Sequence, residues 1–108
     1  MYRVEFRPIA AKEWKKLDKS VSNQFLKILS RRLVEPRIES ARLSGDLDGT
    51  YKISLQKVGY RLVYEVEDDP QVVLVIAVGK RASKEVYVEA SKRLTPTNDG
   101  EDRIGLGL

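Results

Sequence analysis

Apolar and polar positions alternate in the first residues of the chain and then switch to a helical spacing. Residues 2–6 alternate and are rich in β-formers, so they predict a first strand. Pro8 suits the first turn of a helix, and apolar side chains follow at helical spacing as far as Leu17. A second apolar stripe predicts a helix that Ser20 caps and Pro36 ends. We expect these two helices to form a hairpin on one face of a sheet.

Three strand-like runs follow in quick succession, at about residues 50–55, 60–67 and 71–78. The connections between them are so short that neighbouring runs must pair antiparallel. The third run is apolar on both faces, which is typical of a central strand. The pattern returns to a helix from Ser83 to Arg93.

The element order is therefore β-α-α-β-β-β-α, which predicts an α+β fold. We expect an antiparallel sheet with the helical hairpin on one face and the C-terminal helix near the other face or edge. Trp14, the single tryptophan, is expected to anchor the core. The length of 108 residues favours one domain, over residues 1–95, followed by a flexible tail over residues 96–108.

Composition excludes several kinds of chemistry. The chain has no Cys and no His, so disulfides, thiolate metal sites and imidazole catalysis are excluded, and we expect no cofactor and no metal. The longest apolar run is too short to cross a bilayer, and the N-terminus lacks the regions of a signal peptide. We therefore expect a cytoplasmic protein without membrane association.

The net charge of +4 understates how basic the folded part is, because three of the four charged residues after Leu94 are acidic. A basic surface favours nucleic acid or an acidic partner protein.

Strand parity places a group of cations on one face. If the apolar residues of the first two meander strands face the hairpin, Lys52 and Arg61 lie on the opposite face. Arg81 leaves the end of the central strand, and Tyr87 lies on the helix that follows. We expect these four side chains to converge on one concave basic surface. The alternative is a solvated sheet face that carries ordinary surface cations.

Cations and phenols of this kind suit RNA, which carries its own nucleophile in the 2′-OH beside each phosphate. An enzyme cleaves RNA without metal when it orients that hydroxyl, removes its proton, stabilises the phosphorane and protonates the leaving oxygen. Arginines supply fixed donors to phosphate oxygens. A lysine surrounded by arginines releases its proton more readily, which makes Lys52 a candidate base. Tyr87 is placed to stack on a base or to orient the hydroxyl.

Six blocks in the same order and at the same spacing carry a resemblance to a known family. They are Lys12-Glu13-Trp14 with Lys16-Leu17, Pro36-Arg37-Ile38-Glu39, Tyr51-Lys52-Ile53, Gly59-Tyr60-Arg61-Leu62-Val63-Tyr64, Val78-Gly79-Lys80-Arg81 and Glu85-Val86-Tyr87. From about residue 2 to residue 94 the chain resembles the RelE toxins of the RelE/ParE superfamily of bacterial toxin–antitoxin systems.

The resemblance implies a compact fold like that of microbial ribonucleases, and cleavage of mRNA in the A site of the 30S subunit, leaving a 2′,3′-cyclic phosphate and a 5′-OH. It implies inhibition by a RelB-like antitoxin. The toxin is then expected to associate with operator DNA only indirectly, through the antitoxin. The resemblance also implies Lys52 as base or charge stabiliser, Arg61 and Arg81 on the phosphates, and Tyr87 on the substrate base or hydroxyl. The surrounding cations are expected to contact RNA or the ribosome: Arg42, Lys57, Lys80 and Lys84.

Two positions depart from the family pattern. Relatives often carry a second Lys where this chain has Ser54, and an Arg where it has Ser44. Each change removes a cation from the expected site, although Arg42 and Lys57 are nearby. A lost charge-assisted contact to the transition state lowers the rate by roughly 10²–10³.

Two other functions compete with mRNA cleavage. One is a ParE-like poison of DNA gyrase, which is not a nuclease. The combination of Lys52, Arg61, Arg81 and Tyr87 argues against it, because ParE-type chains tend to lack that set. The other is a catalytically weak module whose basic face only holds an acidic antitoxin.

Overall fold

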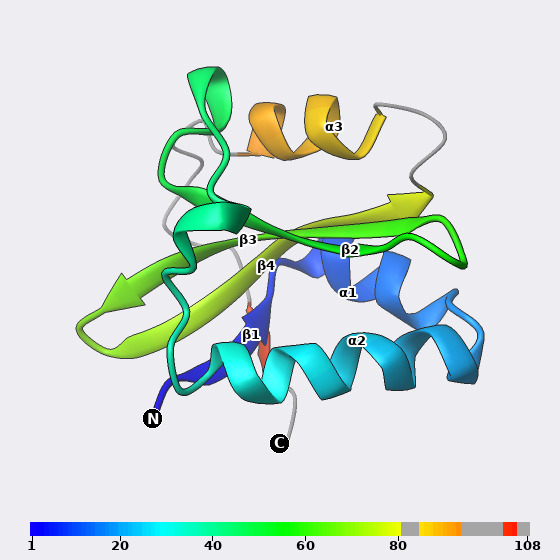
Figure 1. Ribbon diagram of the computed structural model, residues 1–108, viewed down its shortest axis with the longest axis horizontal. Coiled ribbons are helices and arrows are strands. Elements are labelled where there is room, and N and C mark those ends of the chain that lie inside the picture. The colour runs from blue at the N-terminus through cyan, green and yellow to red at the C-terminus, as the bar shows by residue number, and fades with distance from the viewer. Residues whose placement is uncertain (81–84, 94–102, 106–108) are drawn as a thin grey trace.

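The computed structural model describes residues 1–80, 85–93 and 103–105. Their elements follow in the order β1 (Arg3–Phe6), α1 (Pro8–Lys15), α2 (Lys19–Arg32), the 3-10 turns η1 (Glu39–Ala41) and η2 (Gly45–Leu47), β2 (Thr50–Leu55), β3 (Tyr60–Asp68), β4 (Gln71–Lys80), α3 (Glu85–Arg93) and β5 (Ile104–Gly105). The strands form one sheet in the order β2-β3-β4-β1-β5. The α1–α2 hairpin lies on one side of this sheet and α3 on the other (Figure 1). The expected α+β architecture is confirmed.

The face of the sheet toward the α1–α2 hairpin holds the larger core. Alternate residues of the strands point into it, as the period-2 pattern predicts. Its fully buried members include Phe25 and Leu29 of α2 and Ile53, Leu62 and Tyr64 of the strands. Trp14 packs at the border of this core, with its ring 5.2 Å from that of Phe6 and 6.0 Å from that of Phe25. Trp14 therefore anchors the core as predicted.

A smaller core lies between the opposite face of the sheet and α3. It consists of Leu47, Val63, Ile76, Ala77, Val86 and Ala90. The face that carries Lys52 and Arg61 is therefore covered at its centre by α3 and not open along its whole length. The site residues lie around this cover.

The sheet differs from the expectation in one pairing. β2, β3 and β4 form an antiparallel meander, but β1 pairs parallel to β4, with Val4 opposite Val73. A parallel pair needs a long crossover connection, and here the hairpin and the meander provide it. The sheet is mixed and not antiparallel throughout.

The second helix begins and ends differently from the prediction. α2 starts at Lys19, and its N-cap is Asp18 instead of Ser20. The Asp18 carbonyl accepts the N–H groups of Val21 and Ser22 at 2.9 and 3.0 Å, while its side chain makes no capping hydrogen bond. The helix already ends at Arg32, well before Pro36.

The C-terminal residues include a strand that the sequence pattern did not predict. Ile104–Gly105 form β5, which pairs antiparallel with β1. The Arg103 guanidinium donates to both carboxylate oxygens of Glu67 at 2.7 Å and lies 3.6 Å from Glu5. Residues 103–105 of the predicted tail are therefore held by this ion pair and by the open edge of β1, and the rest of the predicted tail lies outside the described residues. No helix in the described part of the chain is long and apolar enough to span a membrane.

Candidate functional site

The register of the meander places the predicted cations in neighbouring rows. Ser54 lies opposite Arg61, and Arg61 lies opposite Gly79, so these three residues form one row across β2, β3 and β4. Lys52 lies opposite Val63, two residue pairs along the strands and therefore on the same face. Diagonal neighbours in such a pair are roughly 7–8 Å apart. Lys52 and Arg61 therefore share a face and are close enough to act on one phosphate group.

Arg61 and Tyr87 are in direct contact. The Arg61 guanidinium carbon lies 4.8 Å from the centroid of the Tyr87 ring, within the range of a cation–π interaction. The Arg61 Nε is buried and has no hydrogen-bond partner among the described residues. A buried donor of this kind is costly unless a ligand satisfies it. The site thus holds a guanidinium with an unpaired, buried Nε against an aromatic ring.

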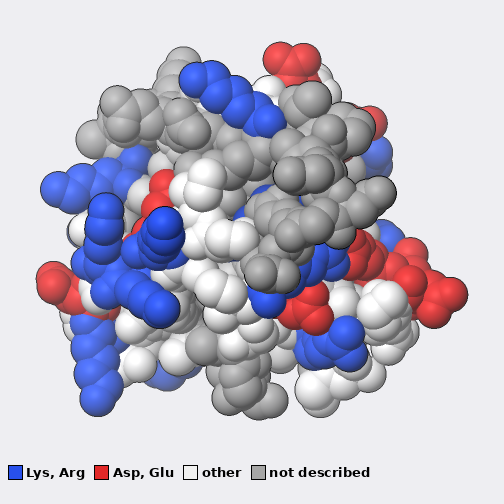
Figure 2. Space-filling model, turned by 180° about the vertical axis from the view of Figure 1, so that it is seen from behind, with Lys and Arg blue, Asp and Glu red and all other residues white. Residues whose placement is uncertain are grey.

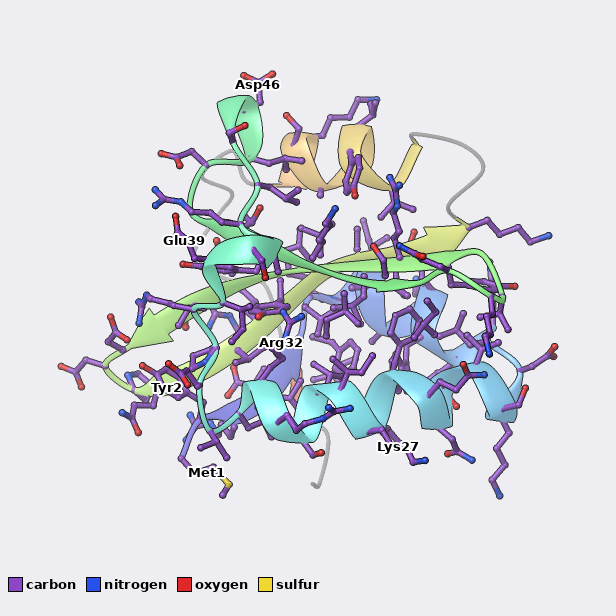
Figure 3. All side chains as sticks on the ribbon, in the orientation of Figure 1. Met1, Tyr2, Lys27, Arg32, Glu39 and Asp46 are labelled. Atoms are coloured by element: carbon purple, nitrogen blue, oxygen red, sulfur yellow. The ribbon has the colours of Figure 1, made fainter. Side chains whose placement is uncertain are left out.

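The backbone of Lys52 is tied to α2. Arg32 points from the end of α2 toward the sheet (Figure 3), and its Nη1 donates to the Lys52 carbonyl at 3.2 Å and to the Tyr64 hydroxyl at 2.8 Å. The Tyr64 hydroxyl in turn donates to the Pro36 carbonyl at 2.6 Å. This network fixes the strand segment that carries Lys52. Sequence reasoning did not assign Arg32 this role, since its only signal is a basic residue at a helix end.

Two other predicted cations lie at the same end of the sheet as Arg61. Lys80 ends β4 opposite Tyr60, in the row next to Arg61, and Lys57 lies in the β2–β3 turn. Both side chains are exposed. Figure 2 shows that Lys and Arg side chains also gather on the side on which β4 ends, most of them below the sheet, toward the hairpin. Within the described residues, Lys52, Lys57, Arg61 and Lys80 form no ion pair, so their charges are available to an anionic ligand.

Arg42 is differently placed. Its guanidinium forms ion pairs with Asp48 at 3.2 Å and Glu39 at 3.9 Å. The hydrogen bond to Asp48 raises the pKa of Arg42 above its ordinary value. These are exposed pairs, which contribute little to stability and exchange partners easily. A contact between Arg42 and RNA remains a prediction, and it requires competition with these two carboxylates.

A hollow of about 530 Å³ opens between η2 and α3 beside Tyr87. Tyr87 belongs to both features, because its ring contacts Arg61 and also lines the hollow. The other lining residues are Ser44, Asp46, Leu47, Val88, Ser91 and Lys92. Asp46 stands at the outer tip of η2 in Figure 3. The hollow is large enough to take a nucleotide against the aromatic ring.

Sequence reasoning identified Tyr87 but missed the residues of α3 that line the hollow with it. Ser91 follows Tyr87 by four residues, and Lys92 follows Val88 by four, so helical spacing was the available signal. Two further predicted site residues, Arg81 and Lys84, lie outside the described residues.

The chemistry available at this site is that of cations, hydroxyls and an aromatic ring. Arginine and lysine donors bind phosphate oxygens, and aromatic rings stack on nucleobases. No group of three acidic residues that could hold a metal ion occurs in the part of the chain that the structure describes. The arrangement suits the binding of single-stranded RNA.

Known proteins share both the sequence and the fold. The family described as the ParE toxin of the type II toxin–antitoxin system parDE matches residues 4–85. The mRNA interferase toxin RelE of Escherichia coli (strain K12) is 50% identical over 93 residues, which cover 86% of this chain and 97% of that protein. A structure of an Escherichia coli RelE mutant in the free state aligns with a TM-score of 0.77 at 49% identity, covering 86% of this chain and 97% of that one. In the intact Escherichia coli RelBE toxin–antitoxin complex, the matching chain has a TM-score of 0.70 at 48% identity, with 74% and 96% covered.

Proposed function

Because this chain belongs to the RelE toxins of the RelE/ParE superfamily, we propose that it is a ribosome-dependent endoribonuclease that cleaves mRNA in the A site. The relatives from Escherichia coli and Shigella flexneri that carry the name mRNA interferase are each 50% identical to it. As the toxin of a toxin–antitoxin system, it arrests translation in the cytoplasm when its antitoxin is absent.

The contact between Arg61 and Tyr87 is the observation that carries this proposal. It joins a phosphate-binding group and a base-stacking ring at 4.8 Å, on the sheet face that also carries Lys52. A nucleotide that stacks on the exposed part of Tyr87 brings its phosphate toward Arg61. The Arg61 guanidinium then donates to a phosphate oxygen.

The proposed reaction begins at the 2′-OH of the nucleotide held against Tyr87. Lys52, in its neutral form, takes the hydroxyl proton, or as a cation it stabilises the charge that develops. The 2′ oxygen attacks the adjacent phosphorus, Arg61 and Arg81 bind the phosphorane oxygens, and the bond to the 5′ oxygen breaks as that oxygen takes up a proton from protonated Lys52 or from water. The products are a 2′,3′-cyclic phosphate and a 5′-OH. No step in this scheme needs a metal ion.

The ribosome completes the site. The few groups available here do not by themselves hold a flexible RNA with its 2′-OH in line with the leaving oxygen, and in-line geometry is a large part of the rate of such reactions. An mRNA held in the decoding site is already constrained. Lys57 and Lys80 are suitably exposed to contact the ribosome or the RNA, and we assign the same role to Arg42 and Lys84.

The partner that neutralises the toxin is a RelB-like antitoxin. Structures of relatives include the intact RelBE complex and RelE bound to a RelB peptide, and their toxin chains are 48% identical to this one. An antitoxin that covers the basic face also brings the toxin to operator DNA, which the toxin itself does not contact.

The test combines induction in cells with mapping of mRNA ends. The parent protein should arrest growth, and primer extension should find cuts at codon positions of translated mRNA. Arg61→Ala, Arg81→Ala and Tyr87→Ala should each restore growth at unchanged protein level. Lys27→Ala removes an exposed cation from α2, on the far side of the sheet, and is the matched control that should arrest growth as the parent does.

Two outcomes would contradict the proposal. Covalent adducts between gyrase and DNA, without mRNA cuts, would indicate a ParE-like poison. An inert protein in both assays would leave only a module that binds an antitoxin.

A further inference from the structure

Gly79 is a glycine for a reason that the other described glycines do not share. Gly45, Gly49 and Gly59 have φ angles of 65°, 88° and 71°, where glycine is favoured, and a Cβ on any of them would meet nothing within 4 Å. Gly79 lies inside β4 without a positive φ. A Cβ there would lie 2.9 Å from Cγ2 of Val86. Space, and not backbone conformation, therefore requires glycine at this position.

The space left by the missing side chain of Gly79 lies where α3 packs on the row of Ser54, Arg61 and Gly79. Gly79 pairs directly with Arg61, so the missing side chain leaves room on the face along which the Arg61 side chain runs. Val86 of α3 fills that room and is buried. The next residue, Tyr87, carries the ring that contacts the Arg61 guanidinium. One small position thus determines how closely α3, and with it Tyr87, approaches Arg61.

A side chain at residue 79 would displace the helix and not the strand. At this point β4 is paired with β3, through Leu62 opposite Val78 and Arg61 opposite Gly79, and the Val78 N–H donates to the Glu13 carboxylate of α1 at 3.3 Å. Val86 is β-branched, so it has little freedom to swing aside within a helix. Ordinary contacts between carbon atoms are about 3.5–4.0 Å. Hence α3 has to move away by at least several tenths of an ångström.

We propose that Gly79 is a positioning residue of the toxin, which holds Tyr87 on Arg61 by letting Val86 pack into the space beside the strand. This inference rests on the proposed function, because the contact that it sets is the one assigned to RNA. Gly79 touches no substrate. It acts through Val86 and the helix that carries Tyr87.

The experiment is a cycle of Gly79→Ala, Val86→Ala and the double variant. Single-turnover cleavage on programmed ribosomes gives the rate, and saturation with enzyme separates that rate from ribosome binding. In NMR spectra, the Arg61 Nε–H signal reports the Tyr87 ring, because a ring current shifts a donor held over its face. Gly79→Ala should lower the rate by roughly 10–100-fold, since a displacement of about 1 Å costs up to that much, while ribosome binding stays close to that of the parent.

The double variant decides whether the effect runs through Val86. Truncation of Val86 removes the colliding methyl group, so the double variant should recover most of the rate and of the parent Arg61 signal. Val86→Ala alone loosens the packing that holds α3, so its own rate is the reference that the double variant should reach. A Gly79→Ala protein that cleaves as the parent does, or a double variant as slow as Gly79→Ala, would overturn the inference. If the parent itself cleaves nothing, the proposed function fails, while the NMR cycle still tests the placement of Tyr87.

Discussion

Replacing Tyr64 with phenylalanine tests the network that fixes the Lys52 strand. Tyr64 is fully buried, and its hydroxyl donates to the Pro36 carbonyl at 2.6 Å and accepts from Arg32 at 2.8 Å. Tyr64→Phe removes only the hydroxyl and keeps the ring, which stacks on Tyr51 with centroids 5.7 Å apart. Any loss of stability therefore measures the hydrogen bonds.

The two lost partners differ in cost. A carbonyl left buried and unsatisfied costs about 1–3 kcal/mol, and we assign that cost to Pro36. Arg32 is half-exposed and regains water, so its lost hydrogen bond costs about 0.5–1.5 kcal/mol. We expect Tyr64→Phe to lower the free energy of unfolding by roughly 1.5–4.5 kcal/mol in total. The cleavage rate should fall as well, because Arg32 also donates to the Lys52 carbonyl.

Urea denaturation followed by the fluorescence of Trp14 is the assay, since Trp14 is the only tryptophan and packs against Phe6 and Phe25. With an unchanged slope, the expected loss moves the midpoint down by about 1–3 M. Tyr51→Phe is the matched control, because Tyr51 is also buried in the sheet but its hydroxyl has no hydrogen bond within the described residues. A Tyr64→Phe protein that loses no more stability than Tyr51→Phe would refute the reasoning.

The same hydroxyl gives a dependence on pH. Burial raises the pKa of Tyr64 above the ordinary value of 10.0, although the hydrogen bond from Arg32 opposes the shift. The folded state therefore holds this proton more tightly than the unfolded chain does. Its contribution to stability is complete below pH 10 and is lost as the pH rises through the pKa of the folded state. Tyr64→Phe should weaken this alkaline loss of stability.

Three further predictions concern the site and the C-terminal strand. Ser54→Lys places a cation opposite Arg61 and should raise the rate of single-turnover cleavage without comparably tighter ribosome binding. If the folded variant cleaves no faster than the parent, another group already stabilises the charge of the transition state. Arg103→Ala should lower stability by about 0–1 kcal/mol above pH 4.5, because its partner Glu67 is partly exposed. The Arg103 hydrogen bond lowers the pKa of Glu67, so acid titration should abolish this difference as the pH falls below 4.5; a loss that persists in acid would exclude the ion pair as its source. Lys80→Ala should weaken ribosome binding and its dependence on salt but spare the saturated cleavage rate, and an unchanged salt dependence would exclude this contact.

Local patterns determined most of the fold. The strand over residues 50–55 was predicted with its observed bounds, because β-formers are framed by turn residues on both sides. Parity along β2 and β3 correctly placed Lys52 and Arg61 on the face away from the hairpin. Of the four residues predicted to converge, Arg61 and Tyr87 are in contact, while Arg81 lies outside the described residues. Both the placement and the contact follow from the fixed periods of strands and helices.

Features that depend on distant partners were not predictable from such patterns. The parallel pairing of β1 joins Arg3 to Val72, and β5 depends on the contact of Arg103 with Glu67. Nothing near these residues in the sequence indicates the partner. The N-cap of α2 is a backbone arrangement at Asp18, which a capping preference for hydroxyl side chains, and hence for Ser20, does not indicate.

Cleavage by purified protein on programmed ribosomes, measured beside the same naked mRNA, tests the central claim most directly. We expect rapid cuts in the A-site codon, with 2′,3′-cyclic phosphate and 5′-OH ends, in the presence of a chelator. We also expect far slower cleavage of naked mRNA, and a strong loss of rate on ribosomes for Arg61→Ala. Equal rates on both substrates, or an Arg61→Ala protein as fast as the parent, would contradict this claim.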